Sequence, residues 1–297
     1  MIGSKAADRI ATGAFYAVGI FTAVLLVVFV GYLLVQGWSK LNLHFLIDPP
    51  EFAKAGGGIG PQLFDSVYML VMAMSITIPV GLAAGIYMAE YAKPGKLTDT
   101  IRLCIETLAS LPSIVIGLFG LIIFVNLTGW GYTLFGGALA VSVLNLPVAT
   151  RVSEDAIRSV PQSIREASYG LGATQWQTIT RAVLPAALPG LLTGFIMTAG
   201  RAFGEAAALL YTAGMSTPLL DYSDLNPFSN SSPLNPFRPG STLAVYIWKV
   251  NSEGLVPDAR EIADGASAVL VMAVLGFNLL SRYLGSLLNA RLVGRRG

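Results

Sequence analysis

Residues 107–150 contain no aspartate, glutamate, lysine or arginine, and this 44-residue uncharged run constrains the fold more than any other feature. Two shorter runs, 10–39 and 66–89, also lack these four residue types. An uncharged apolar run of 18 or more residues is long enough to cross a membrane as a helix. Only 12% of the 297 residues are charged, about half of the share in soluble domains. We therefore predict an all-α polytopic membrane protein.

The uncharged runs and two further apolar segments divide into six expected transmembrane helices. These are predicted at 11–36, 64–91, 103–126, 134–152, 185–213 and 262–288. The longest run is divided because about 20 residues complete one crossing. Residues 126–132 predict the division, since their glycines form turns and their aromatic side chains favour the membrane interface. The first span is too long for a secretory signal peptide and has little cleavage-site character, so we expect it to be retained.

Lysine and arginine are distributed unevenly between the two sides of this arrangement. If the N-terminus is cytoplasmic, 13 of the 19 lie on the cytoplasmic side, five lie outside and Arg201 lies within the membrane. The positive-inside rule then places both termini in the cytoplasm. The outer side would carry two long segments, 37–62 and 214–260, with a short helix at 242–250. The second segment repeats Asn-Pro-Phe at 226–228 and 235–237, and is either a docking surface or a linker.

Residue counts exclude several classes of function. Cys104 is the only cysteine and His44 the only histidine, so neither a disulfide framework nor a histidine cluster for metal is possible. No phosphate-binding G-x-x-x-x-G-K-[ST] loop is present, so ATP would have to bind another chain. The net charge of +2 is too small to suggest nucleic acid as a partner. The residues predict no catalytic group and no cofactor.

A polar stretch at 160–185, between the fourth and fifth spans, predicts a helix-turn-helix elbow on the cytoplasmic side. Pro161 opens a helix over 162–171, on which Arg165 and Glu166 are expected to be exposed. Glycines 170 and 172 end it, and a second helix over 173–183 places Trp176, Ile179 and Val183 on one side. Such an elbow either docks into a partner groove or lies as an amphipathic helix on the lipid headgroups.

The elbow resembles the "EAA loop" of permeases from bacterial ATP-binding-cassette (ABC) importers. Glu166, Ala167, Ser168, Gly172, Leu184 and Pro185 fit the spacing of that loop. Ser168 departs from the usual alanine, and Ala182 stands where isoleucine is usual. The resemblance implies that the elbow docks into a cleft on a separate ATP-binding subunit and transmits its closure.

The fifth predicted span contains two charged residues, Arg201 and Glu205, which are expected to share one helix face because they are four residues apart. Arg201 is 16 residues beyond Pro185, about 24 Å along a helix. A charge at that depth must face the bundle interior or an aqueous path. The pair either neutralises itself or forms an anion site, since the guanidinium fork matches phosphate oxygens.

The sequence around these two residues, RAFGEAAALLYTA over 201–213, resembles the fifth-span signature of phosphate-specific ABC permeases of the A type (PstA-like). Residues 108–119 resemble their third span, and 146–155 fit the segment before the elbow. Ala207 replaces a frequent threonine. The resemblance extends from Ile59 to the C-terminus.

This resemblance implies an ABC type I importer permease fold (MetI-like) in the bacterial inner membrane. Residues 1–62 would form an N-terminal helix with an outer loop, and 63–297 the permease core. The expected partners are a second, related permease chain, a dimer of the cytoplasmic ATP-binding subunit and an extracytoplasmic phosphate-binding protein. The permease itself would not be an enzyme. Arg201 and Glu205 would belong to the phosphate pathway.

Three alternatives remain open at this stage. A permease for sulfate, molybdate or phosphonate could use the same elbow. An ATP-independent channel or secondary transporter would need no elbow and would usually show a pseudo-symmetric repeat, which is not evident. An intramembrane enzyme would need a nucleophile–base pair or metal ligands, and the sequence offers neither.

Overall fold

The computed structural model describes residues 4–51, 56–253 and 257–292, and these form helices joined by turns and loops. The α-helices are α1 Ser4–Trp38, α2 Leu43–Ile47, α3 Gly60–Ile86, α4 Lys96–Ser110, α5 Ser113–Gly120, α6 Leu134–Arg158, α7 Gln162–Gly170, α8 Gln175–Thr178, α9 Leu184–Phe203, α10 Ala207–Leu210, α11 Leu243–Glu253 and α12 Ala259–Leu292. Three π-helical segments continue others: η1 Tyr87–Tyr91, η2 Leu121–Leu127 and η3 Ile179–Val183. The all-α fold class is confirmed.

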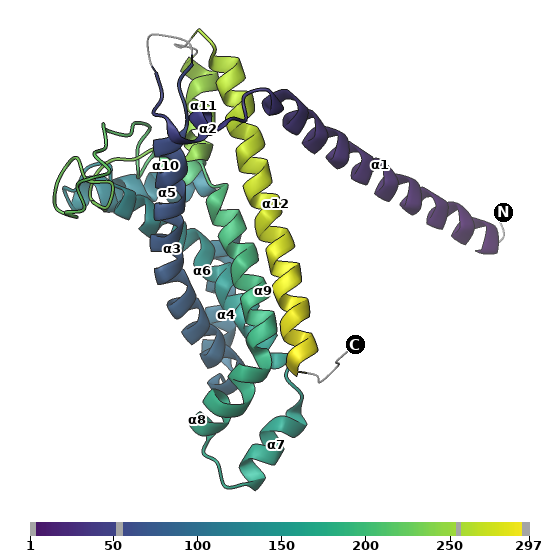
Figure 1. Cartoon of the computed structure of the whole chain (residues 1–297). Helices are drawn as coiled ribbons and strands as arrows, with labels where there is room; N and C mark the ends of the chain where they lie inside the picture. The colour runs from purple at the N-terminus through teal and green to yellow at the C-terminus, as the bar shows by residue number, and fades with distance from the viewer. Residues whose placement is uncertain (1–3, 52–55, 254–256, 293–297) are drawn as a thin grey trace.

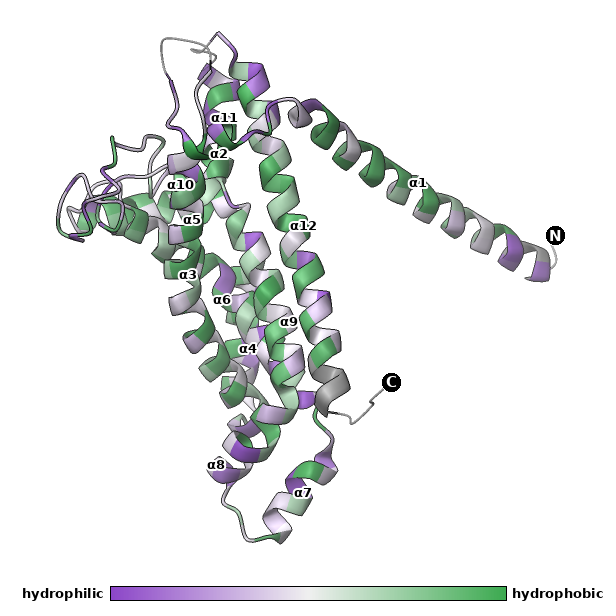
Figure 2. Cartoon of the chain, in the orientation of Figure 1, coloured by the Kyte–Doolittle hydropathy of each residue, from purple (hydrophilic) through white to green (hydrophobic). Residues whose placement is uncertain are grey.

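Helices α3, α6, α9 and α12 form one elongated bundle (Figure 1). We call the end that carries α7 and α8 the elbow end, and the end that carries α2, α11 and the loop 214–242 the cap end. Apolar residues dominate the long helices, whereas hydrophilic residues gather on α7 and α8 (Figure 2). Helix α1 packs on α12 at the cap end, where Gly37 faces Ala268, and then leads away from the bundle (Figure 1). The apolar side chains of its projecting part therefore need cover from lipid or another chain.

Five helical segments in the described part of the chain are long and apolar enough to cross a membrane. They are Asp8–Trp38, Gly60–Tyr91, Leu134–Arg158, Gln175–Phe203 and Ala259–Leu287. Each contains or overlaps a predicted span, and the turn at 128–133 separates η2 from α6 as expected.

Two predicted spans need correction. The third, 103–126, is not one continuous helix, because the chain bends by 97° between α4 and α5–η2 at Leu111 and Pro112. Proline has no N–H and forces the preceding residue out of the helical region, so the break follows from the sequence. The fifth span, predicted to run to residue 213, ends at Phe203.

Close contact between α3 and α6 depends on two glycines spaced four residues apart. Gly81 faces Ala149, and Gly85 faces Ser153 and the backbone of the next residue of α6. A side chain at either glycine would collide with α6, so this pair of glycines is what lets the two helices pack closely. This seam fixes α3 against α6 along the elbow half of the bundle.

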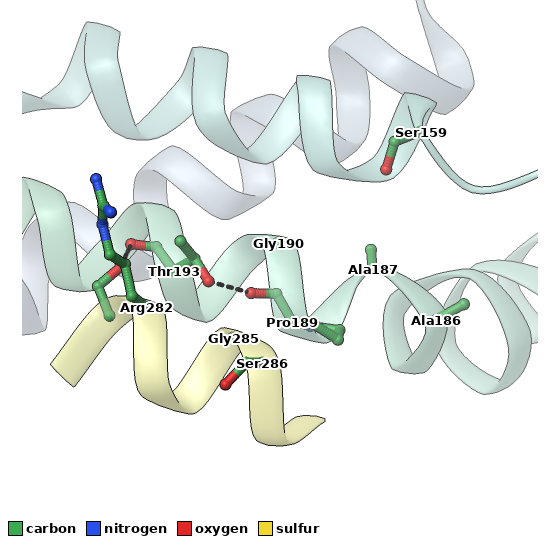
Figure 3. A pocket seen from close by; sticks show the side chains of 10 residues that line it. Ser159, Ala186, Ala187, Pro189, Gly190, Thr193, Arg282, Gly285 and Ser286 are labelled. Carbon is green, nitrogen blue, oxygen red and sulfur yellow. Dashed lines mark hydrogen bonds between the residues drawn. The ribbon is translucent and has the colours of Figure 1, made fainter. Parts of the chain in front are cut away.

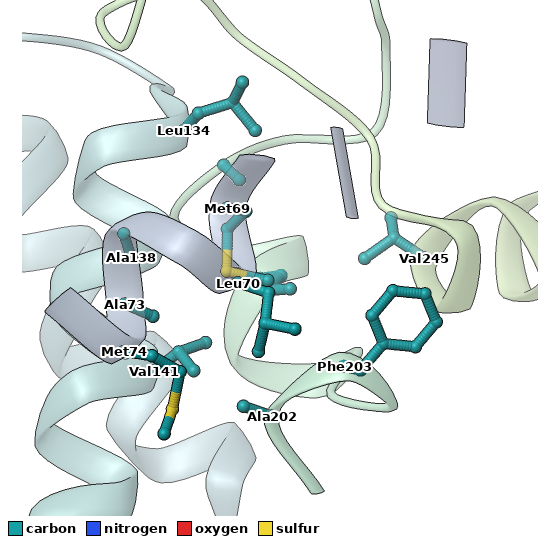
Figure 4. Close-up of a cluster of buried hydrophobic side chains, with 12 residues drawn as sticks. Met69, Leu70, Ala73, Met74, Leu134, Ala138, Val141, Ala202, Phe203 and Val245 are labelled. Atoms are coloured by element: carbon teal, nitrogen blue, oxygen red, sulfur yellow. The ribbon is translucent and has the colours of Figure 1, made fainter. Parts of the chain in front are cut away.

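A second packing region fills the bundle between the seam and the cap. Its buried side chains come chiefly from α3, α6, α9, α10 and α11 and include Met69, Met74, Val141, Phe203 and Val245 (Figure 4). Met69 and Met74 stand nine and 14 residues into α3, about 14 and 21 Å from its start. The end of α9 at Phe203 therefore lies well inside the bundle rather than at its surface.

The loop 214–242 is an ordered cap rather than a loose linker, and its repeated Asn-Pro-Phe forms the same turn twice. The amide oxygen of Asn226 accepts from the backbone N–H of Phe228 at 3.1 Å, and that of Asn235 accepts from Phe237 at 2.9 Å. Such side-chain-to-backbone bonds replace the regular structure that proline prevents. In the same loop, a hydrogen bond from the Ser223 hydroxyl lowers the pKa of Asp221.

A buried ion pair fastens this cap to α3. The guanidinium of Arg238 donates to Asp65 at 2.5 Å, and the two side chains are 2% and 0% exposed. The Thr217 hydroxyl donates to the other carboxylate oxygen at 3.0 Å. The guanidinium also donates to the backbone oxygens of Pro233 and Pro239. The cap is therefore held by charge-assisted bonds to the first turns of a bundle helix.

Candidate functional site

The predicted elbow is present and projects from the end of the bundle (Figure 1). Helix α7 ends at Gly170, and Gly172 has φ +83°, a left-handed conformation that glycine adopts at little cost. Helix α8 begins with a capping box in which the side chains of Thr174 and Gln177 each bond to the other's backbone N–H. It continues through η3 into α9, and the hydroxyl groups of Ser168 and Thr178 lie 2.9 Å apart between the two arms.

The residues that resemble the EAA loop are spread over the whole elbow. Glu166, Ala167, Gly172 and Pro185 are exposed, while Ser168 and Leu184 are half-buried. The prediction that Glu166 is exposed is confirmed.

The prediction that Arg165 is exposed was wrong. Its side chain is 11% exposed and pairs with Glu90, 2.7 Å away at the end of η1. This partner lies 75 residues earlier in the chain, so the local pattern of the elbow could not reveal it.

The apolar side chains of the elbow are not all on one side, where the prediction had placed Trp176, Ile179 and Val183. Ile179 and Val183 are fully buried against the bundle, and Trp176 is 61% exposed. Leu171 and Tyr169 are exposed as well. The surface that the elbow offers to a partner therefore consists of Tyr169, Leu171 and Trp176 around the turn. We call these three the elbow tip.

Arg201 and Glu205 do not share a helix face, contrary to prediction. Helix α9 ends at Phe203, and one carboxylate oxygen of Glu205 accepts from the backbone N–H of Ala208 at 3.2 Å, at the start of α10. The chain turns at Gly204, and α10 packs against α5, where Gly117 faces Ala208. No ion pair joins Arg201 to Glu205 within the described residues.

Arg201 is the one charged residue of α9. Its side chain is exposed on the surface of the single chain, and it makes no hydrogen bond or ion pair to the described residues. Its neighbours Ala202 and Phe203 belong to the packing region inside the bundle. An unpaired charge at that depth is costly in lipid, so it must face another protein chain or water.

The backbone at this depth is interrupted twice, at 111–112 and at 204–206, and the helices that follow the two breaks, α5 and α10, pack against each other. Irregular backbone inside a membrane is tolerated only where protein buries it or where it lines an aqueous cavity. Gly204 is exposed, and a carbon added there would meet only the backbone oxygens of Arg201 and Gly200, at ordinary van der Waals distance. The arrangement therefore suits a polar path next to Arg201.

A separate cavity of about 420 Å³ lies between α6, α9 and α12 near the elbow end (Figure 3). Arg282 is the one charged residue among those that line it. The hydroxyl groups of Thr193, Ser281 and Ser286 all donate to backbone oxygens. Neither Arg201 nor Glu205 lines this cavity, so it is not part of the predicted anion site.

The sequence interpretation missed four buried charges, namely Asp65, Glu90, Glu154 and Arg238. Asp65 and Glu90 stand directly before and after the uncharged run 66–89, and that position is the signal that could have marked them. Glu154 accepts from Arg102 at 2.5 Å and from Arg158 at 2.9 Å, which ties α4 to α6. No group of three or more possible metal ligands was found in the described part of the chain.

Comparison with known proteins decides the family. Residues 81–294 match the family described as "Binding-protein-dependent transport system inner membrane component". The chain belongs to this family. The probable ABC transporter permease protein YqgI of Bacillus subtilis (strain 168) is 54% identical to it over 97% of this chain and 98% of the relative. This permease is thus a multi-pass membrane component of an ABC importer and not itself an enzyme.

Two further similarities bear on fold and substrate. The phosphate transport system permease protein PstA of Xylella fastidiosa (strain Temecula1 / ATCC 700964) is 39% identical over 58% of this permease and 60% of its own length. An inward-facing structure of the MetNI methionine ABC transporter covers 76% of this permease and 94% of that chain, with a TM-score of 0.58 and 19% identity. The structural likeness confirms the MetI-like fold alone. Permeases of this family work with a partner permease, an ATPase subunit and a substrate-binding protein.

Proposed function

We propose that this permease carries inorganic phosphate across the cytoplasmic membrane, with Arg201 as the residue that attracts the anion. The observation that carries the proposal is an exposed arginine without a partner among the described residues, next to a helix break inside the bundle. A guanidinium binds phosphate oxygens bidentately and keeps its charge at any working pH. The partial relatives named as phosphate permeases support this choice of substrate.

In this proposal Glu205 lies beside the pathway and has two functions. One carboxylate oxygen accepts from the N–H of Ala208 in the first turn of α10, which fixes the turn after Arg201. The remaining acceptor capacity of the carboxylate can receive a hydrogen bond from a phosphate hydroxyl, which sulfate lacks near neutral pH. Glu205 would thus favour phosphate over a fully deprotonated dianion.

We further propose that the elbow end is cytoplasmic, because lysine and arginine are concentrated there. Both termini would then be cytoplasmic. The elbow tip, with Glu166, Ala167 and Ser168 beside it, would enter a cleft of the ATP-binding subunit. The cap at the other end would face the phosphate-binding protein.

Uptake in vesicles tests the substrate. The complex of this permease with its co-purifying partners is reconstituted, and ATP-dependent uptake of radiolabelled phosphate is measured against excess sulfate, molybdate or phosphonate. We expect uptake that unlabelled phosphate suppresses and the other three oxyanions do not. Suppression by one of them to the same degree, or uptake without ATP, would contradict the proposal.

The coupling function of the elbow is tested at Gly172. A valine at this position must adopt φ +83°, which branched side chains strongly disfavour, although no atom lies within 4 Å of the added carbon. We therefore expect Gly172→Val to leave the bundle folded but to reduce co-purification of the ATPase subunit severalfold. Gly170→Val is the matched control, because Gly170 also has open space and lies outside the left-handed region. Equal recovery of the ATPase subunit with both variants would refute the docking function.

A further inference from the structure

The elbow is joined covalently to α6 and α9, but its contacts reach a third helix. Residues 159–161 connect it to α6, and η3 connects it to α9. Nothing in the chain path joins it to α3, whose continuation η1 ends at Tyr91. The contacts between the elbow and η1 are therefore its direct link to α3, which is otherwise connected to the elbow only indirectly, through the seam with α6.

Both arms of the elbow hold the same residue, Glu90. From α7, Arg165 donates to the carboxylate through its Nε at 3.1 Å and through an Nη at 2.7 Å. From α8, the side-chain amide of Gln175 donates to the backbone oxygen of Glu90 at 2.9 Å. The carboxylate is 7% exposed, so water competes little for these bonds.

The Arg165 guanidinium also holds the end of α6. It donates to the backbone oxygens of Ile157 at 2.9 Å and Val160 at 2.7 Å. One planar group thus binds three segments in fixed directions, which a lysine ammonium on its flexible stem cannot reproduce. Nearby, Arg158 donates to the backbone oxygen of Met88 at 3.1 Å, so a second bond joins α6 to η1.

We propose that Glu90 and Arg165 are a positioning pair that makes α3 move together with the elbow. The inference rests on the proposed docking of the elbow to the ATP-binding subunit, and it deepens that proposal by naming the helix that receives the movement. Helix α3 contributes Met69 and Met74 to the packing region that contains Ala202 and Phe203. A movement of α3 therefore changes the packing directly beside Arg201.

If the pair makes α3 move with the elbow, the distance between α7 and α3 should be the same with and without nucleotide. Ser163 on α7 and Val80 on α3 are both exposed. Each is replaced by cysteine in a Cys104→Ser background and spin-labelled in the purified complex. Double electron–electron resonance then measures the distance between labels without nucleotide and after trapping with ATP and vanadate. We expect the same narrow distribution in both states.

Loosening the pair should separate the two states. In Glu90→Gln or Arg165→Lys, we expect the distribution to broaden and its mean to differ between the nucleotide-free and trapped complexes. The matched control is Arg151→Lys, in an exposed pair with Glu106 that also joins two helices, and it should leave the distribution narrow. If the Glu90 and Arg165 variants give the same distance distribution as the native protein in both states, the proposal is overturned. A native distance that already differs between the states would overturn it as well.

A second readout separates this inference from the identity of the substrate. In reconstituted vesicles, Glu90→Gln and Arg165→Lys should lower phosphate transported per ATP hydrolysed by about tenfold, within the usual range of coupling between sites, with the ATPase subunit still bound. An unchanged ratio in both variants would contradict the positioning function. If the native complex fails to transport phosphate, the proposed substrate is wrong, but the distance measurement still tests the pair because it requires only nucleotide.

Discussion

Arg238→Ala is expected to destabilise the permease by about 3–5 kcal/mol, the usual cost of leaving one member of a buried ion pair without its partner. Asp65 is 0% exposed and would keep only the Thr217 hydroxyl as a side-chain donor. The backbone oxygens of Pro233 and Pro239 would lose their donor as well. Thermal unfolding in detergent, followed by tryptophan fluorescence, should show a midpoint lowered by several degrees.

Two further variants decide whether the lost pair is the cause. Glu261→Ala removes an exposed partner of Lys40 at the same end of the bundle, and surface pairs contribute only about 0–1 kcal/mol. The double variant Asp65→Leu/Arg238→Met removes both charges and should recover much of the loss, because apolar residues often replace a buried pair without cost. If Arg238→Ala is as stable as Glu261→Ala, the ion pair between Arg238 and Asp65 does not hold the cap.

Arg201→Ala is expected to abolish uptake almost completely, because the pathway loses its positive charge and its donors. Arg201→Lys should retain a small part of the native rate, since it keeps the charge but loses the planar fork. Both variants should fold normally, because the side chain makes no bond to the described residues of this chain. Initial rates of phosphate uptake in vesicles, normalised to the amount of complex, provide the measurement.

Arg282→Ala is the matched control, since Arg282 is also an exposed arginine on a membrane-spanning helix but lines the separate cavity. We expect near-native uptake from it. If Arg201→Ala also transports at the native rate, Arg201 is a structural or interface residue and the anion site lies elsewhere. If Arg201→Ala and Arg282→Ala lose uptake to the same degree, the loss follows from removing any positive charge on these helices, and Arg201 is not a specific anion site.

Most spans were predictable because uncharged runs indicate which segments lie in lipid and turn residues indicate where one span ends. The end of α9 at Phe203 was not predictable. The residues that follow, Ala206, Ala207 and Ala208, favour helix, and a membrane helix tolerates a glycine such as Gly204. What ends the helix there is tertiary. The following turn packs against α5, and Glu205 bonds to the start of α10.

The candidate site shows the same division between local and distant signals. The elbow turn was predictable, since Gly172 marks it locally. The burial of Arg165 was not, because its partner Glu90 is remote in sequence. Arg201 was recognisable as a charge inside an apolar segment, whereas its exposure and its separation from Glu205 depend on where α9 ends.

The distance along the chain between Asp65 and Arg238 has a consequence for biogenesis. Its partner Arg238 lies 173 residues after Asp65 in the chain, so α3 can enter the membrane long before that charge is matched. A chain that ends before Arg238 keeps its first helices, but its Asp65 carboxylate has lost the partner that pairs with it in the complete protein. We expect membrane proteases to remove such fragments faster than full-length chains, so that completion of the cap serves as a checkpoint in the maturation of the permease.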